Sequence, residues 1–198
     1  MKKIILTLTI AMLGTSAYAQ DAYTDYTCGY ADKNYDIQVG KEGTLYIDIM
    51  SLDGSISKAG LMLSRKREED FSACLDTAYK KYMSWREVAI KNNVKELTKE
   101  IPCTCRLEGF FKYGDWQFDY YVSPTFEFTI LESRGKTWYL MIMRTGKMTS
   151  SSNQFMECDA AAVVFSTPEE FKDFMTKIKP ANVDAFIANK PKTEELFK

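Results

Sequence analysis

Five cysteines are the first residues whose type and spacing could carry chemistry: Cys28, Cys74, Cys103, Cys105 and Cys158. One residue separates Cys103 from Cys105, so a disulfide between them would close a very small, strained ring. Strain makes a disulfide oxidising and labile, as thiol–disulfide exchange requires. The sequence lacks a thioredoxin-like C-x-x-C and an obvious βαβ context, so we treat a redox pair at Cys103/Cys105 as the alternative.

Structural disulfides are the expected use of these cysteines, because the N-terminus described below indicates export to an oxidising compartment. Cys74 lies on the apolar stripe of a predicted helix, where a free thiol behaves as a small hydrophobe. We therefore expect two disulfides, with Cys74 reduced and buried. The candidate partners are Cys28, Cys103, Cys105 and Cys158.

The chain has no histidine, which removes Ser-His-Asp and Cys-His nucleophilic chemistry and histidine-containing zinc sites. A thiolate metal site would need four of the cysteines, so we predict no metal and no cofactor. Carboxylate-pair hydrolysis stays open, because acids cluster in one part of the chain without a spacing that singles out two of them. These acids are Asp115, Asp119, Glu127 and Glu132.

Aromatic residues are concentrated between positions 110 and 128. On an extended strand alternate side chains face opposite ways, so Trp116, Phe118 and Tyr120 form one row, with Gln117, Asp119 and Tyr121 on the other. Rings mixed with polar groups could bind a sugar or a peptide. The alternative is a core row backed by a tyrosine-rich solvent row. The predicted binding residues are Tyr113, Trp116, Tyr120 and Tyr121.

The elements that position these residues are organised around residues 125–148. Phe126, Phe128 and Ile130 alternate with polar residues, and Ser133-Arg134-Gly135 then marks a hairpin turn. The returning strand, 137–143, is apolar on both faces, which is typical of a central strand. A similar hairpin, YDIQV and TLYIDIM, occupies positions 35–50, with Asp48 where Met141 stands in the later copy.

Each hairpin is followed by a short apolar strand and a helix. The first set has a strand at 59–63 and a helix from 67–70 that continues, with a kink near Asn92-Asn93, to Pro102. The second has a strand at 160–165, a helix capped by Thr167-Pro168 and Glu170, and a further short helix within 182–190. A third hairpin spans 106–122. The pattern predicts a pseudo-duplicated ββ-β-α unit, with repeats at 35–101 and 125–190.

The first 19 residues have the three parts of a signal peptide: Lys2-Lys3, a short apolar run, and an Ala17-Tyr18-Ala19 cleavage site. Cleavage after Ala19 would leave residues 20–198 as one mature domain with 24 basic and 27 acidic residues. That balance indicates neither a nucleic acid nor an anionic membrane as partner, and the signal run is too short for a membrane anchor. We expect a soluble periplasmic or secreted protein.

Together these patterns predict an α+β protein with mainly antiparallel sheet and two or three helices packed on one side. The expected role is non-catalytic binding of a protein, peptide or glycan. The alternatives are a thiol–disulfide exchange protein and a carboxylate-pair hydrolase.

Overall fold

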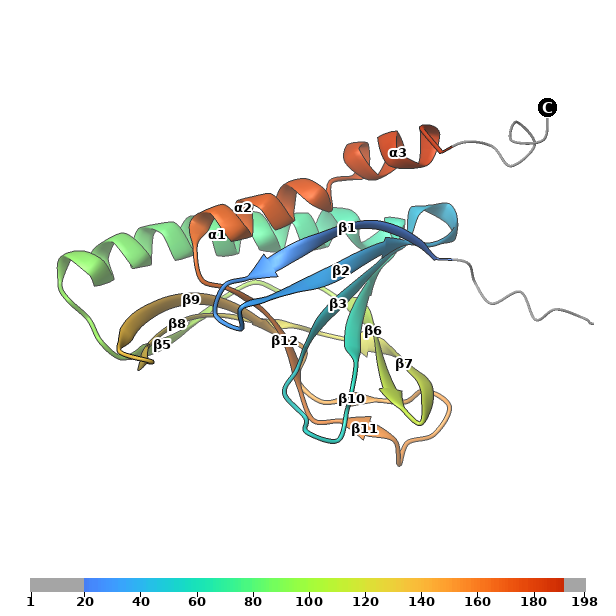
Figure 1. Cartoon of the computed structure of the whole chain (residues 1–198), viewed down its shortest axis with the longest axis horizontal. Coiled ribbons are helices and arrows are strands. Elements are labelled where there is room, and N and C mark those ends of the chain that lie inside the picture. The colour runs from blue at the N-terminus through green and yellow to red at the C-terminus, as the bar shows by residue number, and fades with distance from the viewer. Residues whose placement is uncertain (1–19, 191–198) are drawn as a thin grey trace, which may run out of the picture.

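The structure, a computed structural model, describes residues 20–190 and is an α+β fold dominated by antiparallel sheet (Figure 1). Three helices lie together along one side of the sheet. The strands are β1 Asp21–Cys28, β2 Lys33–Val39, β3 Leu45–Ser51, β4 Ala59–Leu63, β5 Leu97–Ile101, β6 Leu107–Tyr113, β7 Asp115–Val122, β8 Thr125–Ser133, β9 Lys136–Arg144, β10 Met148–Thr149, β11 Glu157–Cys158 and β12 Ala161–Phe165. The helices are α1 Glu68–Lys91, α2 Pro168–Lys177 and α3 Pro180–Ala188.

The main sheet runs in the order β5-β8-β9-β12-β3-β4-β6-β7, and every neighbouring pair is antiparallel. β3 joins two halves, because β12 pairs with its C-terminal end and β2 pairs with its N-terminal end along the same edge. β1 extends the sheet beyond β2. β7 therefore lies at one end of the strand order and β8 next to the other end, although they are adjacent in sequence.

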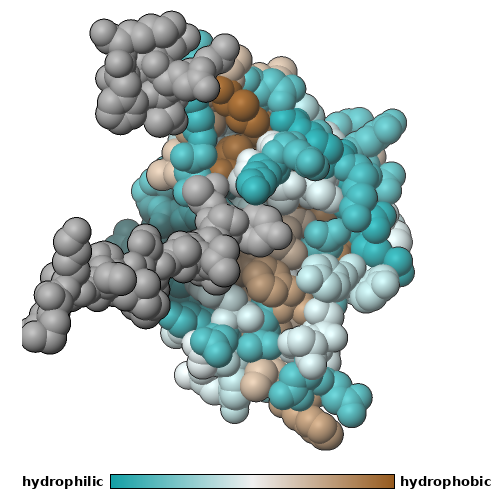
Figure 2. Space-filling model, turned by 90° about the vertical axis from the view of Figure 1, so that its right-hand side faces the viewer, coloured by the Kyte–Doolittle hydropathy of each residue, from teal (hydrophilic) through white to brown (hydrophobic). Residues whose placement is uncertain are grey.

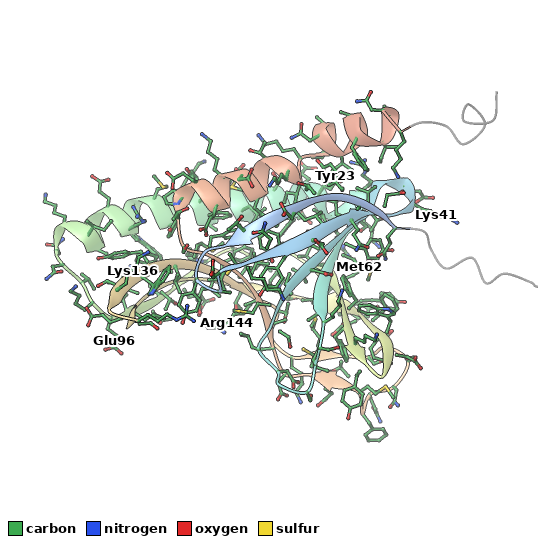
Figure 3. All side chains as sticks on the ribbon, in the orientation of Figure 1. Tyr23, Lys41, Met62, Glu96, Lys136 and Arg144 are labelled. Atoms are coloured by element: carbon green, nitrogen blue, oxygen red, sulfur yellow. The ribbon has the colours of Figure 1, made fainter. Side chains whose placement is uncertain are left out.

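The helices cover one face of the sheet and form the core with it. The predicted apolar stripe of α1 packs inward: Tyr82 is fully buried, and its hydroxyl donates to the Tyr139 carbonyl oxygen at 3.0 Å. On α2, the Phe171 ring stacks on Phe165 of β12 with a centroid distance of 4.7 Å. Tyr23 of β1 donates its hydroxyl to the Lys177 carbonyl oxygen at the end of α2 (Figure 3). These contacts hold α1 and α2 against both halves of the sheet.

The three predicted hairpins are present. Arg134 and Gly135 both have positive φ, 53° and 69°, as a two-residue turn between β8 and β9 requires. β9 lies between β8 and β12, which confirms it as an interior strand. At α2, the Thr167 hydroxyl accepts from the Glu170 amide as predicted, but the Glu170 carboxylate accepts from the amide of Ser166.

The predicted continuation of the first helix to Pro102 is wrong. α1 ends at Lys91, and residues 97–101 form β5, paired with β8. Asn93 has a left-handed φ of 51°, its amide donates to the Ile90 carbonyl, and the Val94 amide donates to the Ala89 carbonyl. This pair of bonds is a Schellman C-cap, with asparagine in the place usually taken by glycine. It turns the chain out of the helix despite the helix-like spacing of Val94, Leu97 and Ile101.

Two further segments contain strands that the sequence analysis did not predict. Residues 21–28 form β1, in which Tyr26 and Cys28 are buried and the backbone pairs with β2. In the long connection between β9 and β12, β10 and β11 pair with each other and form a separate two-stranded ladder. Partner strands satisfy the backbone hydrogen bonds of both segments, which polar composition alone does not reveal.

Candidate binding site on the open face of the sheet

A row of residues crosses four neighbouring strands on the sheet face that points away from the helices. Asp48 of β3 is paired with Gly60 of β4, Gly60 with Phe110 of β6, and Phe110 with Phe118 of β7. Paired residues of antiparallel strands project on the same side. Phe110 and its neighbour Met62 are 6% exposed, yet neither belongs to the main core cluster. The row therefore forms a small aromatic layer outside the core.

Gly60 leaves room for the tip of the Phe110 ring over β4. A Cβ at position 60 would come within 2.0 Å of Phe110 Cζ and within 2.6 Å of two further ring atoms. No side chain could occupy that position without displacing the ring. The Phe110 ring can therefore approach the backbone of β4 closely, because Gly60 has no side chain to keep it at a distance, and the ring forms the floor of the site.

Other rings stand around this floor at steep angles. The Trp116 ring meets Phe110 edge-on, with centroids 5.7 Å apart and planes at 68°. Tyr46 lies on the other side, 6.1 Å from Phe110 at 56°. Together with Phe118 these rings surround a cavity of about 150 Å³. Gln20, Gln38, Asp48 and Lys58 complete its lining.

The cavity has one charged corner. Asp48 Oδ2 lies 3.8 Å from Lys58 Nζ, and the Asp48 side chain is 23% exposed. Burial raises the pKa of Asp48 above its ordinary value, and the nearby Lys58 ammonium opposes this shift. Unlike its lysine partner, the carboxylate is largely withdrawn from water, which strengthens its attraction for a hydrogen-bond donor or a cation that enters the cavity.

Figure 2 views the molecule from the end that carries β6 and β7, and shows brown and white side chains between teal hydrophilic areas. The exposed rings of this end include Trp116 and Phe118, with exposures of 46% and 37%. In Figure 3, Met62 lies on β4 in the middle of this half of the sheet. The aromatic layer is therefore partly open to solvent.

The predicted binding residues are only partly gathered here. Trp116 forms a wall of the cavity, and Tyr120 continues the Trp116–Phe118 row. Tyr113 follows the register of Phe111 and lies on the opposite face, at the end of the hairpin. Tyr121 is 72% exposed and is not turned inward. The pairing of β6 with β7 shifts register between Leu107 and Gly109, so Tyr120 and Tyr121 lie together opposite a single residue of β6.

The inward side of β7 is held by the 144–161 segment. Ser150 donates its hydroxyl to Gln117 Oε1 at 2.7 Å, and the Asp119 carboxylate accepts from the Thr149 amide at 2.9 Å. The Ser151 amide also donates to the Phe118 carbonyl oxygen. These bonds explain the polar residues of the inner row and fix the edge strand that presents the aromatic one.

A second hollow, of about 800 Å³, lies over α1. All of its lining residues come from α1, among them the exposed Met83 and Ile90 between charged side chains such as Arg86 and Glu87. A single helix cannot enclose a cavity, so this hollow is an open helix face. The walls of the 150 Å³ cavity come from four strands, β2, β3, β6 and β7, together with Gln20 and Lys58, and we regard it as the better-formed site although it is smaller.

The four carboxylates considered for hydrolysis are not gathered into a pair. Asp115 and Asp119 are on β7, whereas Glu127 and Glu132 are on β8, near the other end of the strand order. Glu127 accepts from Arg144 at 2.8 Å, and Glu132 lies 3.3 Å from Lys95 Nζ. These two acids therefore hold structural ion pairs.

The five cysteines are free thiols in the structure. Cys103 and Cys105 lie in the connection between β5 and β6, and Cys74 on α1 is a neighbour of both. Cys28 ends β1 beside α2, and Cys158 lies on β11 at the far end of the molecule (Figure 1). The predicted burial of Cys74 is confirmed, but its neighbours are the two thiols expected to bond elsewhere.

Sequence reasoning missed Gly60, Phe110, Tyr46 and Lys58 as site residues, because the cavity depends on cross-strand register. One signal was present: Asp48 is the position where the first hairpin departs from the polarity of the second. A carboxylate in an otherwise apolar strand pattern can indicate a site on the exposed face of the sheet.

Comparison with protein-family models, with curated proteins and with solved structures gives no match. Within residues 20–190, no group of three or more histidine, cysteine or acidic side chains is arranged to hold a metal ion. No helix in that range is both long and apolar enough to cross a membrane. The signal peptide predicted at residues 1–19 lies outside the described residues.

Proposed function

We propose that this chain is an exported binding protein, and that the cavity floored by Phe110 receives one side chain of a protein or peptide partner. The observation that carries the proposal is a walled aromatic cavity with a partly buried carboxylate on the uncovered face of the sheet. Tryptophan and tyrosine beside polar groups are favoured at binding surfaces because one end of each ring is apolar and the other hydrogen-bonds.

The size of the cavity limits what it can hold. Complete small-molecule sites are about 300–1,000 Å³, whereas this cavity is about 150 Å³. It therefore suits a single side chain of a larger partner, with Trp116, Phe118 and Tyr120 providing additional contact area around it.

The ring geometry favours a peptide over a glycan. Sugar stacking uses an exposed flat ring face, but Phe110 is covered and its neighbours stand at 56° and 68° to it. Asp48 at one corner favours a partner side chain that is apolar along its length and carries an amide or a cation at its tip. Lysine, arginine and glutamine have this character.

The redox alternative has weaker support. Reactive cysteines have lowered pKa values, because the thiolate is the nucleophile. Burial and the neighbouring Cys74 raise the pKa values of both Cys103 and Cys105. The hydrolase alternative lacks a gathered acid pair, as described above.

The test is selection of a displayed random dodecapeptide library on the immobilised chain of residues 20–198, followed by affinity measurement with synthetic peptides. We expect enriched peptides to share a long side chain of the stated kind, and W116A and F118A to weaken their binding at least tenfold. Y113A is the matched control, since it removes an equally exposed ring from the opposite face.

Two results would overturn the proposal. One is enrichment of no common motif; the other is an affinity that W116A and F118A leave unchanged. If the chain bound a glycan on an array and both variants lost that binding, the proposed site would be correct and its ligand would be a sugar in place of a peptide. Export is tested separately: the mature protein should begin at Gln20, and a retained Met1 would contradict it.

A further inference from the structure

Three thiols converge where the N-terminal half of α1 meets the connection between β5 and β6. Cys74 lies on the buried face of α1, and the Cys74 thiol neighbours both Cys103 and Cys105. Cys74 and Cys105 are each 4% exposed, whereas Cys103 is half-buried at the edge of the core. This cluster plays no part in the proposed binding site.

The connection is built so that both of its thiols face the helix. Burial alternates along it: Ile101, Cys103, Cys105 and Leu107 are turned inward, and Pro102, Thr104 and Arg106 are exposed. Residues two apart in such a segment project to the same side. The C-x-C spacing therefore places two thiols side by side against Cys74 without any bond between them.

We propose that this cluster is a disulfide site, in which Cys74 bonds to one of the two thiols of the C-x-C segment and the other remains next to the bond. The bond would join α1 to the β5–β6 connection across 29 to 31 positions of sequence. The proposal departs from the expectation that Cys74 stays reduced, because the helix thiol is the one that both loop thiols contact.

The oxidant in this scheme is an external disulfide, R–S–S–R, and the most exposed thiol reacts first. The Cys103 thiolate attacks one of its sulfurs, the S–S bond breaks, and RS⁻ leaves with the proton that Cys103 lost. The Cys74 thiolate then attacks the Cys103 sulfur of the mixed disulfide and expels the second RS⁻, which takes the Cys74 proton. Two protein thiols are oxidised to one disulfide, and the external disulfide is reduced to two RSH.

The remaining thiol, Cys105, can exchange into the bond by attacking the Cys74 sulfur and releasing Cys103. Burial raises the pKa values of both Cys103 and Cys105, so little thiolate of either is present at neutral pH, and both the formation of the bond and this exchange are slow. The arrangement therefore suits a durable structural bond more than a catalytic exchanger.

The test incubates the purified chain of residues 20–198 with oxidised glutathione, blocks remaining thiols with iodoacetamide, and maps tryptic peptides without reduction. Cys74 lies in the peptide 68–80, and Cys103 and Cys105 share the peptide 100–106. We expect these two peptides to be linked, with one carbamidomethyl group on 100–106. The linked protein should melt about 5–10 °C higher than the reduced one.

Variants separate the outcomes. C74A should abolish the link, whereas C28A and C158A should leave it intact; if C74A does not fold, the wild-type peptide map decides alone. A bond inside the peptide 100–106, a link from it to Cys28 or Cys158, or full alkylation of all five cysteines would each overturn the proposal.

Discussion

At the residue scale, the aromatic layer divides into a floor that stabilises the fold and walls that face solvent. Phe110 is 6% exposed and lies on Gly60, whereas Trp116 is 46% exposed. A ring of the first kind contributes mainly to folding, and one of the second kind is available to a partner. The two roles can be separated by mutation.

We expect F110A to lower the free energy of unfolding by about 3–5 kcal/mol, as for other large buried rings. W116A should lower it by only about 1 kcal/mol, because half of its surface is already in water. Urea denaturation of the two variants measures both values. Equal losses would show that Trp116 is part of the folded framework and not a free wall of the site.

Asp48 provides a pH-dependent test of the charged corner. Because burial raises its pKa in the folded protein, the ionised carboxylate reduces stability at neutral pH. This loss is present above the raised folded pKa, shrinks as the pH falls through it, and is absent below the unfolded pKa.

The D48N variant should therefore melt above the wild type near pH 7, and the difference should close toward pH 3. Melting temperatures of both proteins across pH 3–8 give the result. A lower melting temperature for D48N at pH 7 would mean that the ion pair with Lys58 outweighs the desolvation of the carboxylate.

The sequence could indicate the aromatic row of the site but not its cavity. Alternation along one strand correctly places Trp116 and Phe118 on one face. The contacts of Asp48, Gly60 and Phe110 come from three strands, and their alignment is a property of register that no single segment carries. The bulge that turns Tyr121 outward has the same cause, since it appears only in the pairing with β6.

At the element scale, long regular patterns were predictable and short ambiguous ones were not. The stripe of α1 and the glycine-marked hairpins extend over many residues, so period and turn chemistry agree. The spacing of Val94, Leu97 and Ile101 is compatible both with a continued helix and with a short strand. A segment this short does not contain enough residues for the apolar period to decide between them. The C-cap at Asn93 decides the outcome.

That cap gives a prediction at the same scale. Asn93 has a left-handed φ of 51°, which valine tolerates poorly. We expect N93V to destabilise the protein by about 1–2 kcal/mol, and the matched variant N93G to be neutral or slightly stabilising. Urea denaturation measures both. Equal stability of the two variants would show that the left-handed cap does not control the end of α1.

At the scale of the whole molecule, the helices occupy one face of the sheet and leave the other to the aromatic layer. α1 packs on β8 and β9, and α2 packs on β1 and β12; Tyr82 of α1 and Phe171 of α2 are both part of the main core. The segments 35–101 and 125–190 share the elements β2-β3-β4-α1 and β8-β9-β12-α2, but β10 and β11 interrupt the second set, and β5 and α3 follow the two helices. Their duplication remains a prediction.

Two surfaces of the whole molecule compete as binding sites: the cavity on β3, β6 and β7, and the open face of α1. The most direct test is a titration of ¹⁵N-labelled protein with a peptide selected as described above, followed by amide chemical shifts. We expect the largest changes at Tyr46, Asp48, Phe110, Trp116 and Phe118. Changes confined to residues 79–91 would place the site on α1 and contradict the account.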